Sequence, residues 1–170
     1  YIGNAGDALV KGLEFELNAH PFESLTASLA GSYQHAYLLH GATAEQFAAN
    51  PTLGLTGGTI PEVPRFQFSA ELKYTHAITD RLLGEAAADI NYRGHTNSSF
   101  ETDPFNVPLS SYSLLNLRAG ITSGPWTANV FVRNATNKRA EISAIDSFGN
   151  PLTFLTVRPR TIGMNVTRTF

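Results

Sequence analysis

The amino-acid sequence predicts an all-β protein built from antiparallel strands. Apolar and polar residues alternate with a period of two along most of the chain, which is the spacing of side chains on one face of a strand. Several alternating runs are about twice as long as the five or six residues of a typical globular strand. Short and long connections also follow one another in strict order between the runs. These three observations set the fold class and limit how the strands can be arranged.

The first four runs place apolar side chains on one face of each strand. In the first run, Leu13, Phe15 and Leu17 alternate with Glu14 and Glu16. The second run repeats this pattern, and the third shows it most clearly. The fourth contains three consecutive alanines, a stretch that also permits a helix, but its alternation continues beyond them and favours a strand. These strands are predicted at residues 13–19, 25–37, 66–75 and 82–93.

The remaining runs give three more strands, at residues 115–122, 126–133 and 161–170. Leu117, Val130 and Met164 lie at the centres of their apolar faces. The connections at residues 20–24, 78–81 and 123–125 are short enough for tight hairpins. The connections at 39–63, 94–109 and roughly 144–156 are long and rich in turn-forming residues. In an antiparallel meander, all short turns then lie at one end of the sheet and all long loops at the other.

Long strands with sorted connections are typical of an outer-membrane β-barrel. About nine to eleven residues of a tilted strand cross a bilayer, and the apolar faces carry no charge at their centres. A sheet in lipid has to close, because unpaired backbone groups in hydrocarbon cost several kcal/mol each. A single-chain bacterial barrel usually has an even number of strands, with both ends of the chain on the short-turn side. Here the predicted number is seven, and the first strand enters from the long-loop side while the last leaves on the short-turn side. We therefore expect this chain to supply the terminal strands of a larger barrel.

The aromatic residues fit two membrane interfaces. Tyr74 and Trp126 fall near the short turns, whereas Tyr33, Phe66 and Tyr92 fall near the long loops. Two such girdles are expected where amphipathic rings meet the headgroup regions.

The composition excludes several classes of protein. The chain has 170 residues, 42% hydrophobic and 15% charged, with a formal net charge of −2, which argues against a polybasic nucleic-acid binder. There is no cysteine, so a disulfide framework or a thiolate site is excluded. The sequence contains no run of about 18 consecutive apolar residues, so no transmembrane helix is predicted. No signal peptide is evident, and Tyr1 is interpreted as a cut within a longer protein.

Four segments together resemble TonB-dependent outer-membrane receptors. They are residues 11–17 (KGLEFEL), 60–66 (IPEVPRF), 130–139 (VFVRNATNKR) and 158–170, which ends in Phe170. The resemblance covers the whole chain and corresponds to the C-terminal part of the family's β-barrel. It implies that residues 1–170 belong to a barrel of about 22 strands, with the plug domain and the earlier strands outside this sequence.

The resemblance also implies roles for particular residues. Phe170 would belong to the terminal-strand signal that the barrel-assembly machinery reads, and residues 134–139 would lie within the long penultimate strand. The sequence departs from the family pattern at Ala140 and Arg168, where aromatic residues are common. Arg168 lies close to the end of its strand, so its guanidinium group can extend to the headgroups.

The function implied by the resemblance is transport. The protein would bind a scarce extracellular solute, such as a ferric siderophore, and import it with energy delivered by the TonB complex through an N-terminal region. Outer-membrane lipid and the assembly machinery would be further partners, with no nucleic acid. No catalysis and no cofactor are expected, since the sequence lacks a nucleophile elbow, a P-loop and a dinucleotide fingerprint.

Arg65 and Arg93 are the candidate ligand-binding residues, because they are cations placed near the outer mouth of the barrel on its polar face. Glu85 and Asp89 could form an acid–base pair, but four residues of strand separate them by about 13 Å, too far for a cooperative pair. The five histidines show no metal-ligand spacing, and no metal site is predicted.

Two other classes remain open from the sequence. One is a small self-contained outer-membrane barrel that acts as a porin or an adhesin. The other is a soluble β-barrel or sandwich that binds an apolar ligand. The soluble alternative requires the apolar faces to converge in a shared core, whereas a membrane barrel requires them to point outward.

Overall fold

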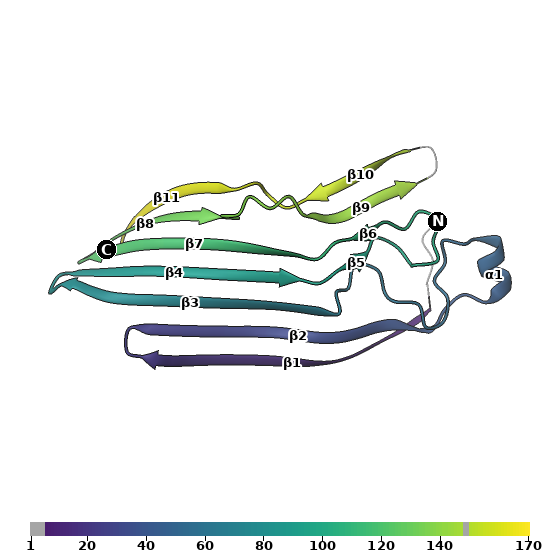
Figure 1. The fold of residues 1–170 in the computed structure, drawn as a ribbon, viewed down its shortest axis with the longest axis horizontal. Helices are drawn as coiled ribbons and strands as arrows, with labels where there is room; N and C mark the ends of the chain where they lie inside the picture. The colour runs from purple at the N-terminus through teal and green to yellow at the C-terminus, as the bar shows by residue number, and fades with distance from the viewer. Residues whose placement is uncertain (1–5, 148–149) are drawn as a thin grey trace.

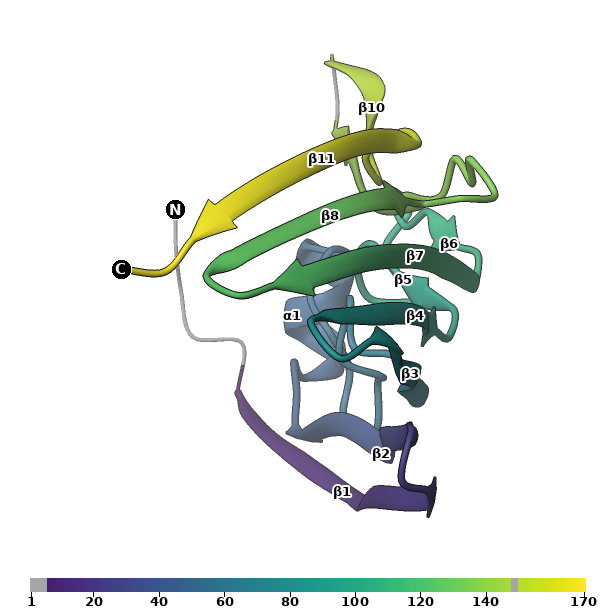
Figure 2. The same cartoon turned by 90° about the vertical axis from the view of Figure 1, so that its left-hand side faces the viewer.

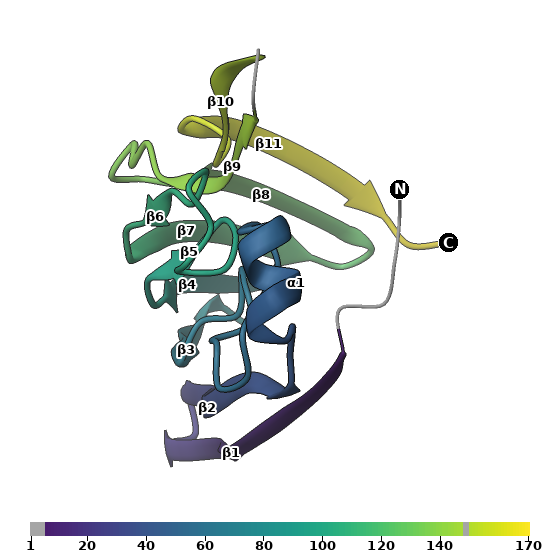
Figure 3. The ribbon, with the colours of Figure 1, turned by 90° about the vertical axis from the view of Figure 1, so that its right-hand side faces the viewer.

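The computed structural model describes residues 6–147 and 150–170. Seven of its strands form one antiparallel sheet in the order β1-β2-β3-β4-β7-β8-β11 (Figure 1). The short turns and the C-terminus lie at one end of the sheet, and the long loops lie at the other. The end-on views show a curved sheet whose edges, β1 and β11, lie far apart (Figures 2 and 3). No helix of the described residues is long and apolar enough to cross a bilayer.

The strands of the main sheet are β1 (Asp7–Phe22), β2 (Leu25–His40), β3 (Phe66–Thr79), β4 (Leu82–Arg93), β7 (Tyr112–Ser123), β8 (Trp126–Arg133) and β11 (Thr161–Arg168). The elements of the long-loop end are the helix α1 (Ala44–Ala49) and two small hairpins, β5 (Thr96–Asn97) with β6 (Pro108–Leu109) and β9 (Glu141–Ser147) with β10 (Asn150–Thr156). A capping box starts α1, in which Thr43 and Gln46 satisfy each other's backbone amides.

The register keeps apolar residues beside one another across the whole sheet. One row consists of Leu72, Ala88, Leu117, Val132 and Ile162, each paired with the next. A shift of one residue in any ladder would move a full set of apolar side chains to the opposite side. The sheet therefore has one continuous apolar face and one polar face.

The apolar face is exposed in this chain. Leu72, Leu117 and Val130 expose 56%, 42% and 56% of their surface. They do not converge on a shared core, as the soluble alternative requires. They lie exposed together on one face of the sheet, as the residues of a lipid-facing surface would.

The predicted strand pattern is confirmed by the seven-stranded sheet, although β1 extends beyond its predicted bounds at both ends. Two expectations differ from the structure. Residues 134–139 do not continue the penultimate strand, because β8 ends at Arg133 and the chain leaves the ladder there. The connection expected near residues 144–156 contains the paired strands β9 and β10 among its described residues.

The described apolar side chains that are buried lie mostly at the long-loop end. Ala36 and Leu38, at the end of β2, expose only 3% each. The loop that follows β2 folds back on them, since Leu38 N donates to Gly58 O at 2.9 Å and Ile60 N donates to Ala36 O at 3.0 Å. A Cβ at Gly54 would lie 2.5 Å from Leu38 Cδ1 and 2.6 Å from the Phe100 ring, so a larger residue would displace the Leu38 or Phe100 side chain. The loops therefore form a packed layer above the sheet.

Asn134 explains why β8 ends where it does. Its backbone has φ 49°, a left-handed conformation that cannot continue a strand. The side chain is buried, and its Nδ2 donates to the carbonyl oxygens of Lys138 and Arg158, both at 2.9 Å. Its Oδ1 accepts from Lys138 N at 2.8 Å, and its own backbone N donates to Asn116 Oδ1 at 2.9 Å. One side chain thus joins the end of β8 to the segment that leads into β11.

We predict that replacing Asn134 destabilises the protein. Asn134→Gly relieves the left-handed backbone but leaves buried polar groups unpaired, each at a cost on the order of 1–3 kcal/mol. Asn134→Ala also strains the left-handed backbone at this position, so it should lower the free energy of unfolding more than Asn134→Gly does. Urea unfolding of the full-length protein in detergent, followed by gel mobility without heating, measures both effects. Asn165→Ala, which changes an exposed asparagine of β11, serves as the control. Unfolding of Asn134→Gly at the wild-type urea concentration would show that the side-chain bonds contribute nothing.

Candidate functional site

The polar face carries rows of hydrophilic side chains near the long-loop end. The register places Glu14, Ser32, Gln67, Arg93 and Tyr112 in one row across five strands. Gln67 Nε2 donates to Ser32 Oγ at 3.3 Å within this row. These positions face the polar side because each lies one residue away from a member of the apolar face.

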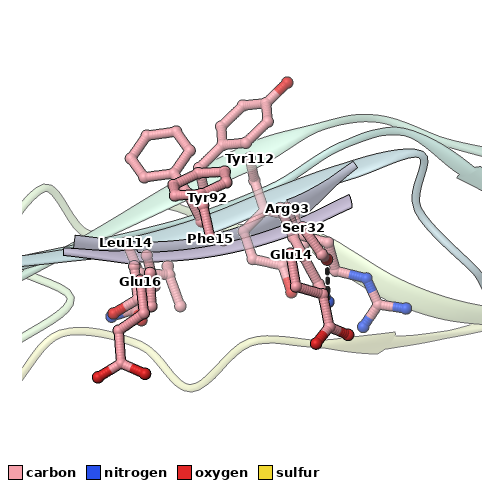
Figure 4. A pocket seen from close by; sticks show the side chains of 14 residues that line it. Glu14, Phe15, Glu16, Ser32, Tyr92, Arg93, Tyr112 and Leu114 are labelled. Atoms are coloured by element: carbon pink, nitrogen blue, oxygen red, sulfur yellow. Dashed lines mark hydrogen bonds between the residues drawn. The ribbon is translucent and has the colours of Figure 1, made fainter. Parts of the chain in front are cut away.

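A groove of about 680 Å³ surrounds this row. Figure 4 shows the carboxylates of Glu14 and Glu16 and the guanidinium of Arg93 on one side of the sheet, with the Tyr92 ring on the other. Because one sheet layer separates the two sides, a single solute cannot contact all of the lining residues. The polar side is the part that can meet a hydrophilic ligand.

Arg93 is held in place by the loop layer. The side chain is half-buried, and its Nη2 donates to the carbonyl oxygen of Glu62 at 2.6 Å. Glu62 has φ 59°, its backbone N donates to Asn97 O at 2.9 Å, and its Oε1 accepts from Ser143 Oγ at 2.6 Å. One loop residue therefore connects Arg93 to two other loop segments. A guanidinium group has five N–H donors, so this bond leaves donors for a second partner.

Arg65 lies near Arg93 but outside the groove. It precedes β3 directly, and the Gln67–Arg93 pairing brings both arginines to the same end of the neighbouring strands. Its side chain is exposed, while its carbonyl oxygen accepts a bond from Gln34 N at 2.8 Å. Of the two arginines predicted from the sequence, only Arg93 belongs to the groove lining.

Further along the polar face, Glu85 and Asp89 accept hydrogen bonds from nearby charged or polar side chains. Glu85 accepts from Lys73 at 3.2 Å and from Arg118 at 2.9 Å. Asp89 Oδ2 accepts from Asn91 at 2.8 Å and from Asn116 at 2.7 Å. Glu85 and Asp89 thus have separate partners, and their arrangement is that of cross-strand bridges.

The histidines lie apart. His40 Nδ1 contacts Asp7 Oδ2 at 3.2 Å, and the His35 ring lies 4.9 Å from that of Tyr37. The described residues contain no group of three or more side chains suited to hold a metal ion.

Sequence reasoning missed Glu62, Ser143 and Tyr112. Tyr112 continues the row of Arg93, but its strand was predicted to start at residue 115. Glu62 stands between two prolines in the segment IPEVPRF, which indicates a turn. Its contact with Ser143 joins residues 81 positions apart, a separation that no local pattern reveals.

Phe170 lies at the short-turn end and is fully exposed. The guanidinium carbon of Arg168 lies 4.9 Å from the centre of its ring. The chain is held close to this position by a bond from Thr169 N to Pro125 O at 2.9 Å.

Several solved receptors have a similar fold. The ferric yersiniabactin uptake receptor FyuA from Yersinia pestis superimposes with a TM-score of 0.79 and 19% identity, covering 98% of this chain and 24% of that chain. The ferric preacinetobactin receptor BauA from Acinetobacter baumannii gives 0.69 and 17%, covering 96% of this chain and 22% of that chain. The ferripyoverdine receptor of the outer membrane of Pseudomonas aeruginosa gives 0.61 and 18%, covering 95% of this chain and 19% of that chain. The chain thus spans about a quarter or less of these structures.

A comparison with curated proteins found no match. The family described as TonB dependent receptor-like, beta-barrel matches residues 1–135, which is most of the sequence. The alternating faces, the sorted connections and the solved relatives agree with this match. The chain therefore belongs to the TonB dependent receptor-like β-barrel family and is part of a bacterial outer-membrane β-barrel.

Proposed function

We propose that this chain forms the C-terminal portion of the barrel of a receptor that imports a scarce extracellular solute, with a ferric siderophore as the favoured class. The observation that carries the proposal is the continuous apolar face, backed by a polar face that leads to a packed layer of loops. Such a wall separates lipid from a hydrated interior. The matched structures include receptors for ferric yersiniabactin and ferric preacinetobactin, which supports the siderophore class.

In this proposal the remaining parts of the receptor lie outside these 170 residues. A plug domain, the earlier strands and a segment that contacts the TonB complex would complete the transporter. The sheet has two unpaired edges, β1 and β11, that would pair with those earlier strands. These edges also argue against a self-contained barrel made from the seven described strands alone.

Arg93 is the residue that we assign to ligand contact. It lies at the outer end of the polar face, carries a fixed positive charge, and is oriented by the Glu62 carbonyl. Ferric siderophores present oxygen-rich and often anionic surfaces, to which a guanidinium group can donate several hydrogen bonds. Arg65, which is more exposed, would make a secondary contact from the loop rim.

Phe170 would act during assembly rather than in transport. Its exposed ring ends the terminal strand, where the assembly machinery would bind it before the barrel closes. Outer-membrane lipid would then cover the apolar face.

We predict that uptake depends on the full-length protein and on TonB. Deleting the encoding gene should abolish growth on one ferric siderophore as the sole iron source, and inactivating TonB should have the same effect. Uptake of radioactive iron from that siderophore measures the transport directly. Normal uptake from every siderophore, together with lost uptake of a corrinoid, haem or oligosaccharide, would replace the siderophore class with that solute.

We predict that Arg93→Gln weakens ligand binding by about 10-fold or more, since a charge-assisted hydrogen bond contributes about 1.5–3 kcal/mol. Arg93→Lys retains the charge and should lose less. Binding of the ferric siderophore to the purified receptor, followed by quenching of protein fluorescence, gives the dissociation constant. Arg133→Gln is a matched control, because Arg133 is an exposed arginine of the polar face that lies over Phe131.

A second variant distinguishes direct ligand contact by Arg93 from an effect of the loop layer on ligand binding. Ser143→Ala removes the bond to Glu62 but leaves Arg93 and its carbonyl partner. Unchanged binding in this variant supports direct contact by Arg93. A loss equal to that of Arg93→Gln would assign the effect to the loop layer instead.

A further inference from the structure

Arg168 is a charged residue on the apolar face, and solute uptake does not account for it. The register pairs it with Trp126, which lies in the same apolar set as Ala128, Val130 and Val132. Its guanidinium carbon lies 5.4 Å from the centre of the Trp126 ring and 4.9 Å from that of Phe170. The cation is thus held between two aromatic rings at the short-turn rim of the face that meets lipid.

The charge of Arg168 is not neutralised within the described part of the chain. Among those residues no acidic side chain forms an ion pair with it. The strand residues of the apolar face carry no Asp, Glu, Lys or Arg between Lys11, at the long-loop rim, and Arg168. Arg168 therefore lies at the depth of the headgroups, where an anion from the membrane can reach it.

An apolar groove of about 310 Å³ lies on the same face as Arg168, and Val166 is the lining residue nearest to Arg168 along β11. Its walls come from Ile121, Val130, Met164 and Val166, and the short side chains of Ala119 and Ala128 line its floor. The register aligns Ile121, Ala128 and Val166 in one row and Ala119, Val130 and Met164 in the next, so the groove runs across β7, β8 and β11. Arg168 follows Val166 on the same face, about 7 Å further along the strand.

We propose that this groove and Arg168 form a binding site for a glycerophospholipid of the periplasmic leaflet. The short turns of an outer-membrane barrel face the periplasm, which places Arg168 at that leaflet. One acyl chain lies in the groove over Ala128, between Ile121 and Val166. The lipid phosphate accepts hydrogen bonds from the Arg168 guanidinium, whose planar donors match a phosphate group.

The two parts of the site act differently. Apolar contact with the barrel gains little over contact with other lipids, because the surrounding acyl chains are equally apolar. The groove therefore positions the chain by shape, and the arginine–phosphate contact provides selectivity. An annular lipid elsewhere on the apolar face would have the hydrophobic contact without the charged one.

Native mass spectrometry of the full-length receptor, titrated with phosphatidylglycerol in detergent micelles, tests the proposal. Arg168→Gln and Ala128→Leu should each weaken the first phosphatidylglycerol-binding step by about tenfold, the first by removing the charge and the second by filling the groove. Arg168→Lys should recover part of the loss. Lys11→Gln, which removes the cation at the opposite rim, should leave this step unchanged.

Each alternative result has a definite meaning. Equal binding by wild type and Arg168→Gln overturns the proposal, as does an equal loss in Lys11→Gln, which would indicate general attraction to charge. Complete competition by inorganic phosphate would also overturn it, because the groove would then play no part. Gel mobility without heating confirms that each variant is folded, and Ala128→Leu tests the site away from the terminal residues if Arg168→Gln fails to assemble.

Discussion

Backbone hydrogen bonding between neighbouring strands and the alternation of side chains act together in this sheet. Each strand has to satisfy its amides through its neighbours, because hydrocarbon offers no partner. The pairing that does so also has to keep the apolar row from Leu72 to Ile162 in line across five strands. A slip of one residue would bring polar residues such as Glu71 to the lipid side. The register, more than any individual contact, therefore determines which side chains lie on the apolar face and which lie on the polar face.

The sheet and the loops differ in which of their apolar side chains are buried. Side chains such as Leu72 are exposed on the apolar face of the sheet, whereas Leu38 is buried under the loop that follows β2. Asn134 and Glu62 join the two parts, and both adopt left-handed backbone conformations. Asn134 follows the end of β8, Glu62 lies in the loop that leads to β3, and each links stretches of chain that are distant in sequence. The sheet thus carries a packed outer layer that is anchored on the buried end of β2.

Much of the sheet could be predicted from the sequence, because alternation is a local signal that survives without knowledge of the partners. The long-loop end was predicted less well. Residues 134–139 were expected to extend β8, since nothing nearby shows that the Asn134 side chain binds Lys138 and Arg158. The alternation of apolar and polar residues is enough to place Arg93 on the polar face. Its contact with Glu62, however, depends on how a long loop folds. Pairings across loops come from tertiary structure, which a period-two pattern does not encode.

The contact between Arg93 and Glu62 uses a main-chain oxygen as its acceptor. Every amino acid supplies that oxygen, so the anchor requires a backbone shape at position 62 and tolerates changes in the side chains around it. Natural selection can then diversify the surface of the loop while its attachment to the wall is preserved. A receptor constructed in this way can acquire a new specificity through changes in its loops, while the sequence of its strands stays the same.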